Sequence, residues 1–292
     1  MKAIQTINLT KRYGKHRGIE NVGLAIDEGD FFGFIGPNGA GKSTTIRTLL
    51  GLIFPTSGTA EIFGKQIVND KTEILAQVGY LPSEAIYYGN MRVRDILSFA
   101  AKSRRINCKK EAAQLCERLE LDPSRKVGEL SLGNRKKGGI VLAMQHNPRL
   151  YILDEPTSGL DPLMQQEFYS LLKERNRQGA TVFLSSHILS EVTRYCEHAA
   201  VIREGSVLVS DSVKNLAHTG VKQVTLQGIA AVPEINGTTN MSFNNGCAKF
   251  LYRGDQSELI RALSALRFED VTIADPDFED IFLHYYTKEE DL

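Results

Sequence analysis

The stretch Gly36-Pro-Asn-Gly-Ala-Gly-Lys42-Ser43 fits the pattern G-x-x-x-x-G-K-[ST] and decides the fold. In such a loop the backbone N–H groups wrap the phosphates of a nucleotide, the lysine neutralises them and the hydroxyl reaches Mg²⁺. An apolar run of strand length, residues 31–35, comes directly before the loop, and the helix-compatible residues 44–50 follow it. The loop therefore lies at a helix N-terminus, which attracts phosphate. The sequence predicts an ATP or GTP site rather than a glycine-rich turn with a solvated lysine.

The overall composition narrows the class of protein. Of the 292 residues, 24% are charged and 42% are hydrophobic, which is ordinary for a soluble globular protein. At roughly 100–200 residues per domain, this length suits one large domain and one small one. Lys and Arg total 35 and so do Asp and Glu, so no net positive field attracts nucleic acid. No nucleic-acid partner is expected.

The sequence also predicts where the chain is located. No apolar run approaches the roughly 18 residues of a membrane helix, and the first residues lack the apolar core of a signal peptide. The four cysteines form no C-x-x-C pair, so neither a zinc site nor a disulfide framework is indicated. The expected location is the cytoplasm, and contact with a membrane is expected only through a partner.

Hydrophobic periodicity predicts an α/β fold followed by a smaller region. Two alternating stretches before residue 27 indicate an antiparallel sheet, and helical periodicity over about residues 93–121 indicates a helical insertion. The apolar runs at 150–155 and 180–187 end in polar residues, as is typical of buried parallel strands that carry side chains to a ligand crevice. After about residue 220, hairpin-turn signals, one helical stretch and strand-like runs indicate a small α+β region.

Further motifs follow the phosphate loop in a specific order. Leu130-Ser-Leu-Gly-Asn134 lies shortly before Leu153-Asp-Glu-Pro-Thr-Ser-Gly-Leu-Asp161, and His187 ends the next apolar run. Over roughly residues 1–215 this order resembles the nucleotide-binding subunit of an ABC transporter, in which the motifs are the signature, the Walker B strand with its D-loop, and the switch histidine. The resemblance implies an ABC-type ATPase domain over residues 1–219, with a mixed-sheet core, an N-terminal antiparallel sheet and a helical subdomain at about 84–148. Residues 220–292 then form a small α+β accessory domain.

The resemblance implies a site for ATP and Mg²⁺. Asp154 is expected to hold Mg²⁺ through water, as a hard oxygen ligand for a hard cation. Glu155 is the expected general base, a role worth roughly 10²–10⁴-fold in rate, and His187 is expected to contact the γ-phosphate. The alternatives are a solvated acid pair and a structural histidine. The other expected nucleotide-binding residues are Tyr13, which stacks on adenine, and Gly36, Pro37, Asn38, Gly39, Ala40, Gly41, Lys42, Ser43 and Thr44, of which Ser43 also binds Mg²⁺.

The signature is expected to act across a dimer. Ser131 is a natural N-cap of the following helix, so Ser131 and the amide of Gly133 present a helix N-terminus to the γ-phosphate held by the opposing subunit. Asn134 and Asp161 are expected at the same interface. Because each motif occurs once, a second cassette, identical or related, has to complete each site.

Three positions depart from the family pattern. Leu132 replaces the usual first glycine of the signature, and Asn134 replaces the usual glutamine. Ser83 stands where the family places the glutamine that reaches Mg²⁺ and the attacking water. Serine is shorter, so Ser83 would act through a water, or Glu84 would substitute for it.

Residues 276–283 resemble the C-terminal segment of cassettes that serve bacterial multidrug, antibiotic-peptide and ion exporters. The implied partners are a second cassette, in a homodimer or heterodimer, and a separate transmembrane permease, which places the chain peripherally on the inner face of the cell membrane. The permease contact is expected near residues 86–93, where Tyr87 and Tyr88 are either contacts or merely packed aromatics.

Two alternatives remain. A soluble ABC ATPase that acts on ribosomes or DNA usually carries two cassettes or a long inserted coiled coil, and neither is present in this sequence. A phosphate-loop kinase would not carry the signature, the D-loop and the histidine in combination.

Overall fold

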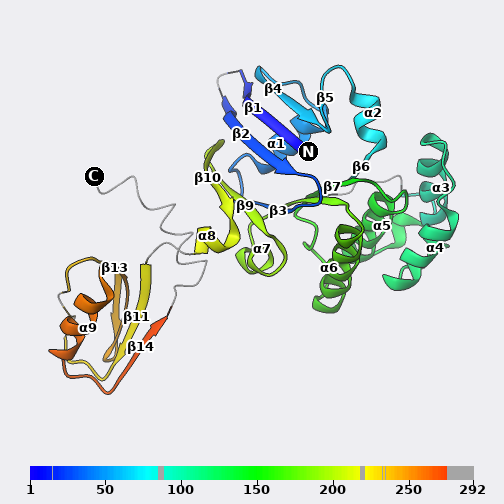
Figure 1. Cartoon of the computed structure of the whole chain (residues 1–292). Helices are drawn as coiled ribbons and strands as arrows, with labels where there is room; N and C mark the ends of the chain where they lie inside the picture. Colours follow the sequence, from blue (N-terminus) through cyan, green and yellow to red (C-terminus); the bar gives the residue numbers. More distant parts are fainter. Residues whose placement is uncertain (15, 85–88, 218–220, 232, 234, 275–292) are drawn as a thin grey trace. The chain divides into compact units, whose positions relative to one another are not determined.

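A computed structural model of the chain describes residues 1–14, 16–84, 89–217, 221–231, 233 and 235–274 (Figure 1). The chain divides into two compact units, Met1–Asp211 and Ser212–Leu292. The expected permease contacts Tyr87 and Tyr88 and the exporter-like segment 276–283 lie outside the described residues.

A six-stranded sheet with the order β10-β9-β3-β8-β7-β6 forms the centre of the first unit. β3 pairs in parallel with β8 and β9, and β7 pairs in parallel with β6 and β8. The two-residue turn Glu204-Gly205, with φ of 49° and 83°, joins β9 to β10 as in a hairpin, so β10 runs antiparallel and the sheet is mixed. The bounds are β3 (Phe31–Ile35), β6 (Val78–Leu81), β7 (Leu150–Asp154), β8 (Thr181–Ser186), β9 (His198–Arg203) and β10 (Ser206–Ser212).

The strands that carry the motifs are buried on both faces. Every residue of β3, β7 and β8 is buried, which explains why these segments read as continuous apolar runs instead of alternating ones. α6 follows β7 and begins at Pro162, after an N-cap in which the Asp161 carboxylate accepts a hydrogen bond from the Met164 amide at 3.0 Å. The helices that alternate with the strands are α1 (Lys42–Leu49), α2 (Lys71–Ala76), α6 (Pro162–Arg177) and α7 (Leu189–Tyr195).

A second, antiparallel sheet has the order β2-β1-β4-β5, and two of its strands come before the phosphate loop in sequence and two after it. Its strands are β1 (Lys2–Tyr13), β2 (His16–Asp27), β4 (Ser57–Ile62) and β5 (Lys65–Gln66). Tyr13 ends β1, where it pairs in register with His16. The mixed sheet and this antiparallel sheet confirm the predicted α/β architecture, with a mixed-sheet core and an N-terminal antiparallel sheet.

In its described residues, the predicted helical insertion has three helices and a short 3-10 turn. They are α3 (Val93–Ser103), α4 (Lys109–Arg118), η1 (Val127–Glu129) and α5 (Leu132–Met144). Figure 1 shows α3, α4 and α5 gathered beside β6, at the end of the sheet opposite β10. The insertion therefore adjoins the strand that leads into Ser83.

The second unit is a small α+β structure with its own core. Its antiparallel sheet has the order β12-β13-β11-β14, and α9 contributes the buried side chains of Leu259 and Leu263 to a core with Val224, Leu226 and Phe250. The bounds are α8 (Val213–Ala217), β11 (Val221–Gln227), β12 (Thr238–Asn244), β13 (Cys247–Arg253), α9 (Gln256–Ser264) and β14 (Asp270–Ala274).

A titratable pair joins the start of β9 to the residue before β3, and it makes stability depend on pH. His198 Nδ1 lies 3.0 Å from Asp30 Oδ1, and this hydrogen bond raises the pKa of His198 above its ordinary 6.5. The pair's contribution to the free energy of unfolding is thus complete below about pH 6.5 and is lost as the pH rises through the folded-state pKa. We expect the Tm of wild type to exceed that of His198→Gln by more at about pH 5.5 than at about pH 8.5. A Tm difference that stays constant or widens with pH would contradict this assignment.

Candidate nucleotide-binding site

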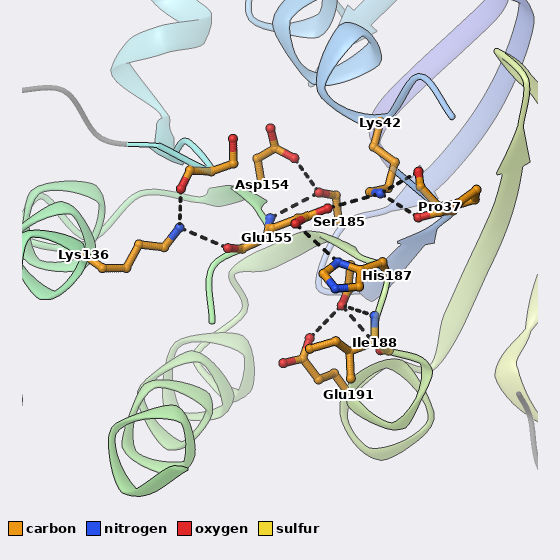
Figure 2. A network of polar contacts seen from close by, with 12 residues as sticks. Pro37, Lys42, Lys136, Asp154, Glu155, Ser185, His187, Ile188 and Glu191 are labelled. Carbon is orange, nitrogen blue, oxygen red and sulfur yellow. Dashed lines mark hydrogen bonds and ion pairs between the residues drawn. The ribbon is translucent and has the colours of Figure 1, made fainter. Parts of the chain in front are cut away.

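Three segments meet at one edge of the six-stranded sheet. The phosphate loop follows β3, Glu155 follows β7 and His187 follows β8. The register pairs Ile35 with Ser186 and Asp154 with Ser185, so the carboxyl ends of these neighbouring parallel strands are level. In an open α/β sheet this edge is where ligands bind. Figure 2 shows the side chains that converge there.

Glycines shape the phosphate loop. A Cβ on Gly36 would lie 2.5 Å from the Ile202 carbonyl oxygen, so only glycine fits against β9. Gly41 has a φ of 110° and is the N-cap of α1, a conformation that other residues rarely adopt. No side chain caps α1, so amides of its first turn are left for an anionic ligand.

Lys42 is the cation of this loop. Its side chain is only 5% exposed, and Nζ donates to the carbonyls of Gly36 at 2.6 Å and Pro37 at 3.1 Å. Nζ also lies 3.2 Å from Glu155 Oε1 (Figure 2). The ammonium is thus held within the loop, and one of its partners is a carboxylate that belongs to another strand end.

Glu155 occupies the centre of the polar network. Its φ is 46°, in the left-handed region that is uncommon for residues other than glycine and often marks functional sites. The Glu155 amide donates to the Ser185 carbonyl at 3.1 Å, which fixes this turn of the chain. Its carboxylate lies between Lys42 and His187, whose Nδ1 is 3.3 Å from Oε2.

Asp154 has an oxygen suited to a metal ion. The side chain is 1% exposed, and Oδ1 accepts a hydrogen bond from Ser185 Oγ at 2.7 Å. Among the described residues Oδ2 has no hydrogen-bond partner, which is costly for a buried carboxylate oxygen. An oxygen ligand of this kind fits a hard cation such as Mg²⁺.

A cavity of about 200 Å³ lies against the phosphate loop. Arg17 and Gly18, which the sequence did not single out, line it as well; a Cβ on Gly18 would lie 2.9 Å from the Tyr13 ring, so glycine admits that ring. Tyr13 is 45% exposed, as a ring that stacks on a base has to be. The predicted residues that line the cavity are Tyr13, Pro37, Asn38, Gly39, Gly41, Lys42, Ser43, Thr44 and Glu155. Of the other loop positions, Gly36 contacts Lys42 and Ala40 is buried.

His187 is positioned by residues that the sequence alone did not reveal. Ser186 Oγ donates to Glu191 Oε2 at 2.7 Å and accepts from the Ile188 amide at 2.9 Å. Ser186 and Glu191 are both buried, so the turn that carries His187 is anchored to α7. A cavity of about 220 Å³ lies between His187, Glu155 and the D-loop residue Gly159.

The signature residues lie apart from the cavity beside Lys42. Ser131 is the N-cap of α5 and accepts from the Asn134 amide at 3.3 Å, and Asp161 caps α6 in the same way. A Cβ on Gly133 would lie 2.9 Å from the Gly159 carbonyl oxygen, so the signature abuts the D-loop of its own chain. Four residues are predicted to act across the dimer: Ser131, Gly133, Asn134 and Asp161. Within the described part of the chain, none of them lines the cavity beside Lys42. Their role at the opposing subunit's nucleotide stays a prediction.

A phosphate loop beside a buried aspartate, a partly exposed glutamate and a histidine defines the site as that of a phosphate-loop nucleotide-binding protein. The profile of the family described as ABC transporter matches residues 19–158. The bacitracin transport ATP-binding protein BcrA of Bacillus licheniformis is 44% identical over 211 residues, which cover 70% of this chain and 68% of that protein. The linearmycin resistance ATP-binding protein LnrL of Bacillus subtilis is 29% identical, over 81% of each chain.

Solved structures agree with these relatives. The structure of an ATP-binding subunit of an ABC transporter matches with a TM-score of 0.70 and 29% identity, over 73% of this chain and 91% of that one. A dimeric ATP-binding cassette in a post-hydrolysis state, bound to ADP and Pi, matches with a TM-score of 0.63 and 26% identity, over 72% of this chain and 98% of that one. The chain belongs to the ABC transporter family, in which it is an ATP-binding and ATP-hydrolysing subunit. These relatives do not support the ribosome or DNA alternative.

Proposed function

We propose that the chain powers an exporter of antibiotic-like compounds, as the ATPase subunit bound to a separate transmembrane permease at the inner face of the cell membrane. The bacitracin transport and linearmycin resistance proteins support this function, as does the exporter-like sequence of residues 276–283. In the described part of the chain, no helix has the length and apolarity needed to cross a membrane. In this proposal a separate permease supplies the path for the substrate.

The position of Glu155 carries the mechanistic proposal. Lys42 and the loop amides bind the phosphates of ATP, and Tyr13 stacks on its base. The γ-phosphate then competes with Glu155 for the Lys42 ammonium, which lies 3.2 Å from Oε1 in this structure. Glu155, once released, orients the attacking water and takes its proton, while His187 contacts the γ-phosphate.

Mg²⁺ is the expected metal. Ser43 and Asp154 would hold it, and Ser83 would reach it through a water. When bound, the ion neutralises charge on the β- and γ-phosphate oxygens. The unpaired Oδ2 of Asp154 is the observation that supports this metal site.

Dimerisation completes each site in this proposal. Ser131, Gly133, Asn134 and Asp161 of one cassette face the nucleotide of the other, either in a homodimer or with a related cassette. The structure of a dimeric relative supports this arrangement. We further propose that residues 1–219 are the ATPase domain, with the helical subdomain at about 84–148, and that residues 220–292 are an accessory domain.

Affinity capture tests the exporter proposal. The Glu155→Gln chain, tagged and captured from solubilised cells with ATP and Mg²⁺, is expected to retain a polytopic membrane protein, identified by mass spectrometry. Lys42→Ala, captured in parallel, should retain less second cassette because it binds less ATP. Recovery of ribosomes or DNA-repair proteins without a membrane partner would contradict the exporter proposal and leave the ATPase assignment intact.

A further inference from the structure

Lys136 is a buried lysine one turn into α5, the helix that begins beside the signature. Its side chain is 4% exposed, whereas lysine is almost never fully buried unless its charge is paired. Burial lowers the pKa of Lys136 to about 8, against the opposing effect of the nearby Asp154 and Glu155 charges. A buried ammonium requires hydrogen-bond acceptors that offset its lost hydration.

Three backbone carbonyls supply those acceptors. Lys136 Nζ donates to the carbonyl oxygens of Pro82 at 3.2 Å, Ser83 at 3.0 Å and Glu155 at 3.0 Å. Figure 2 shows the bond from Lys136 to Glu155. An ammonium has three donors, so each one has a partner. The acceptors belong to two separate segments, the loop that follows β6 and the turn that follows β7.

These two segments carry groups that the reaction needs side by side. β6 and β7 are parallel neighbours with Leu81 level with Leu153, so the chain leaves both strands at the same edge of the sheet. Beyond that edge the strands no longer hydrogen-bond to each other, and Lys136 provides a direct link between Ser83 and Glu155. The link comes from α5, whose N-terminus carries Ser131.

We propose that Lys136 is a positioning residue, which ties the signature helix to the Ser83 loop and to the Glu155 turn and so holds Glu155 in its working position. This inference rests on the proposed role of Glu155 as the general base. A displacement of α5 at the signature would be transmitted through Lys136 to the base of the same cassette. The expected influence of Lys136 is therefore on turnover and not on the affinity for ATP.

The number of donors at position 136 gives a graded test. Methionine is of similar length and has no donor, whereas glutamine has one NH₂ group with two. We expect Lys136→Met to lower kcat about tenfold, because small misplacements of catalytic groups cost up to about 10²-fold, while KM for ATP stays within about threefold. The kcat of Lys136→Gln should lie between that of Lys136→Met and that of wild type. Lys136→Gln also keeps the test valid if Lys136→Met folds poorly. Lys137→Met, the same change at the adjacent buried lysine of α5, is the matched control.

A double-mutant cycle with Glu155→Gln separates positioning from general destabilisation. If Lys136 acts through Glu155, Lys136→Met should slow the residual hydrolysis of Glu155→Gln by less than about threefold, compared with about tenfold in wild type. Equal factors in both backgrounds, or unchanged turnover of Lys136→Met, would overturn the inference while Glu155 kept its role. Normal turnover of Glu155→Gln alone would remove the general base and this inference with it.

Discussion

Glu155→Gln is expected to hydrolyse ATP at least about 10²-fold more slowly than wild type while it still binds ATP. Glutamine keeps the shape of the side chain but cannot take a proton from water. It also removes the carboxylate that lies 3.2 Å from Lys42 Nζ, so the ammonium becomes more available to phosphate. Affinity for ATP should therefore be equal to or higher than that of wild type. Phosphate release at saturating ATP measures turnover, and equilibrium dialysis measures binding.

The same variant should accumulate as a nucleotide-bound dimer, because the step that reopens the dimer is slowed. Size-exclusion chromatography with ATP and Mg²⁺ would detect that dimer. Glu117→Gln, an exposed position on α4, is the matched control and should hydrolyse ATP normally. Unimpaired turnover of Glu155→Gln would show that another group activates the water.

The sequence predicted the strands of the site well because each carries a strong local signal. β3, β7 and β8 are buried along their whole length, so they appear as apolar runs, and each ends in polar residues at the ligand edge. β6 and α2 were not predicted. β6 has only four residues, and α2 has six with one buried side chain, so both are too short to show a repeated hydrophobic pattern.

Several contacts of the site could not be predicted because they join distant segments through the backbone. Lys136 is one of many lysines in the sequence. Two of its acceptors are main-chain carbonyls more than 50 positions away and the third is 19 positions away, and no residue type indicates such contacts. Ser186 ends β8 and Glu191 lies in the first turn of α7, and in the sequence both are ordinary polar residues. The left-handed φ of Glu155 is likewise a property of the folded chain, because the sequence there offers no glycine to indicate it.

Lys42→Ala is expected to weaken ATP binding by roughly 10–10²-fold, the effect of losing charge-assisted hydrogen bonds to phosphate. In the structure the Lys42 ammonium is nearly fully buried and bound to two loop carbonyls, so it is already in position when the nucleotide arrives and little side-chain entropy is lost. Alanine removes that cation and leaves the Glu155 carboxylate close to the phosphates without its positive partner, which adds repulsion to the lost attraction. Equilibrium dialysis with ATP measures the change.

Lys42→Ala and Glu155→Gln should have contrasting effects on binding and turnover, and this contrast tests the site as a whole. Lys42→Ala should lose affinity in every nucleotide state that has phosphates, whereas Glu155→Gln should lose turnover alone. Lys110→Ala, an exposed position on α4, controls for the removal of a positive charge. A cooperative melting transition without nucleotide should show that each variant is folded. Added ATP should then raise the Tm of Glu155→Gln more than that of Lys42→Ala, because Lys42→Ala binds ATP more weakly. Normal ATP affinity in folded Lys42→Ala would mean that the loop amides alone bind the phosphates, and that the buried ammonium serves to hold Glu155.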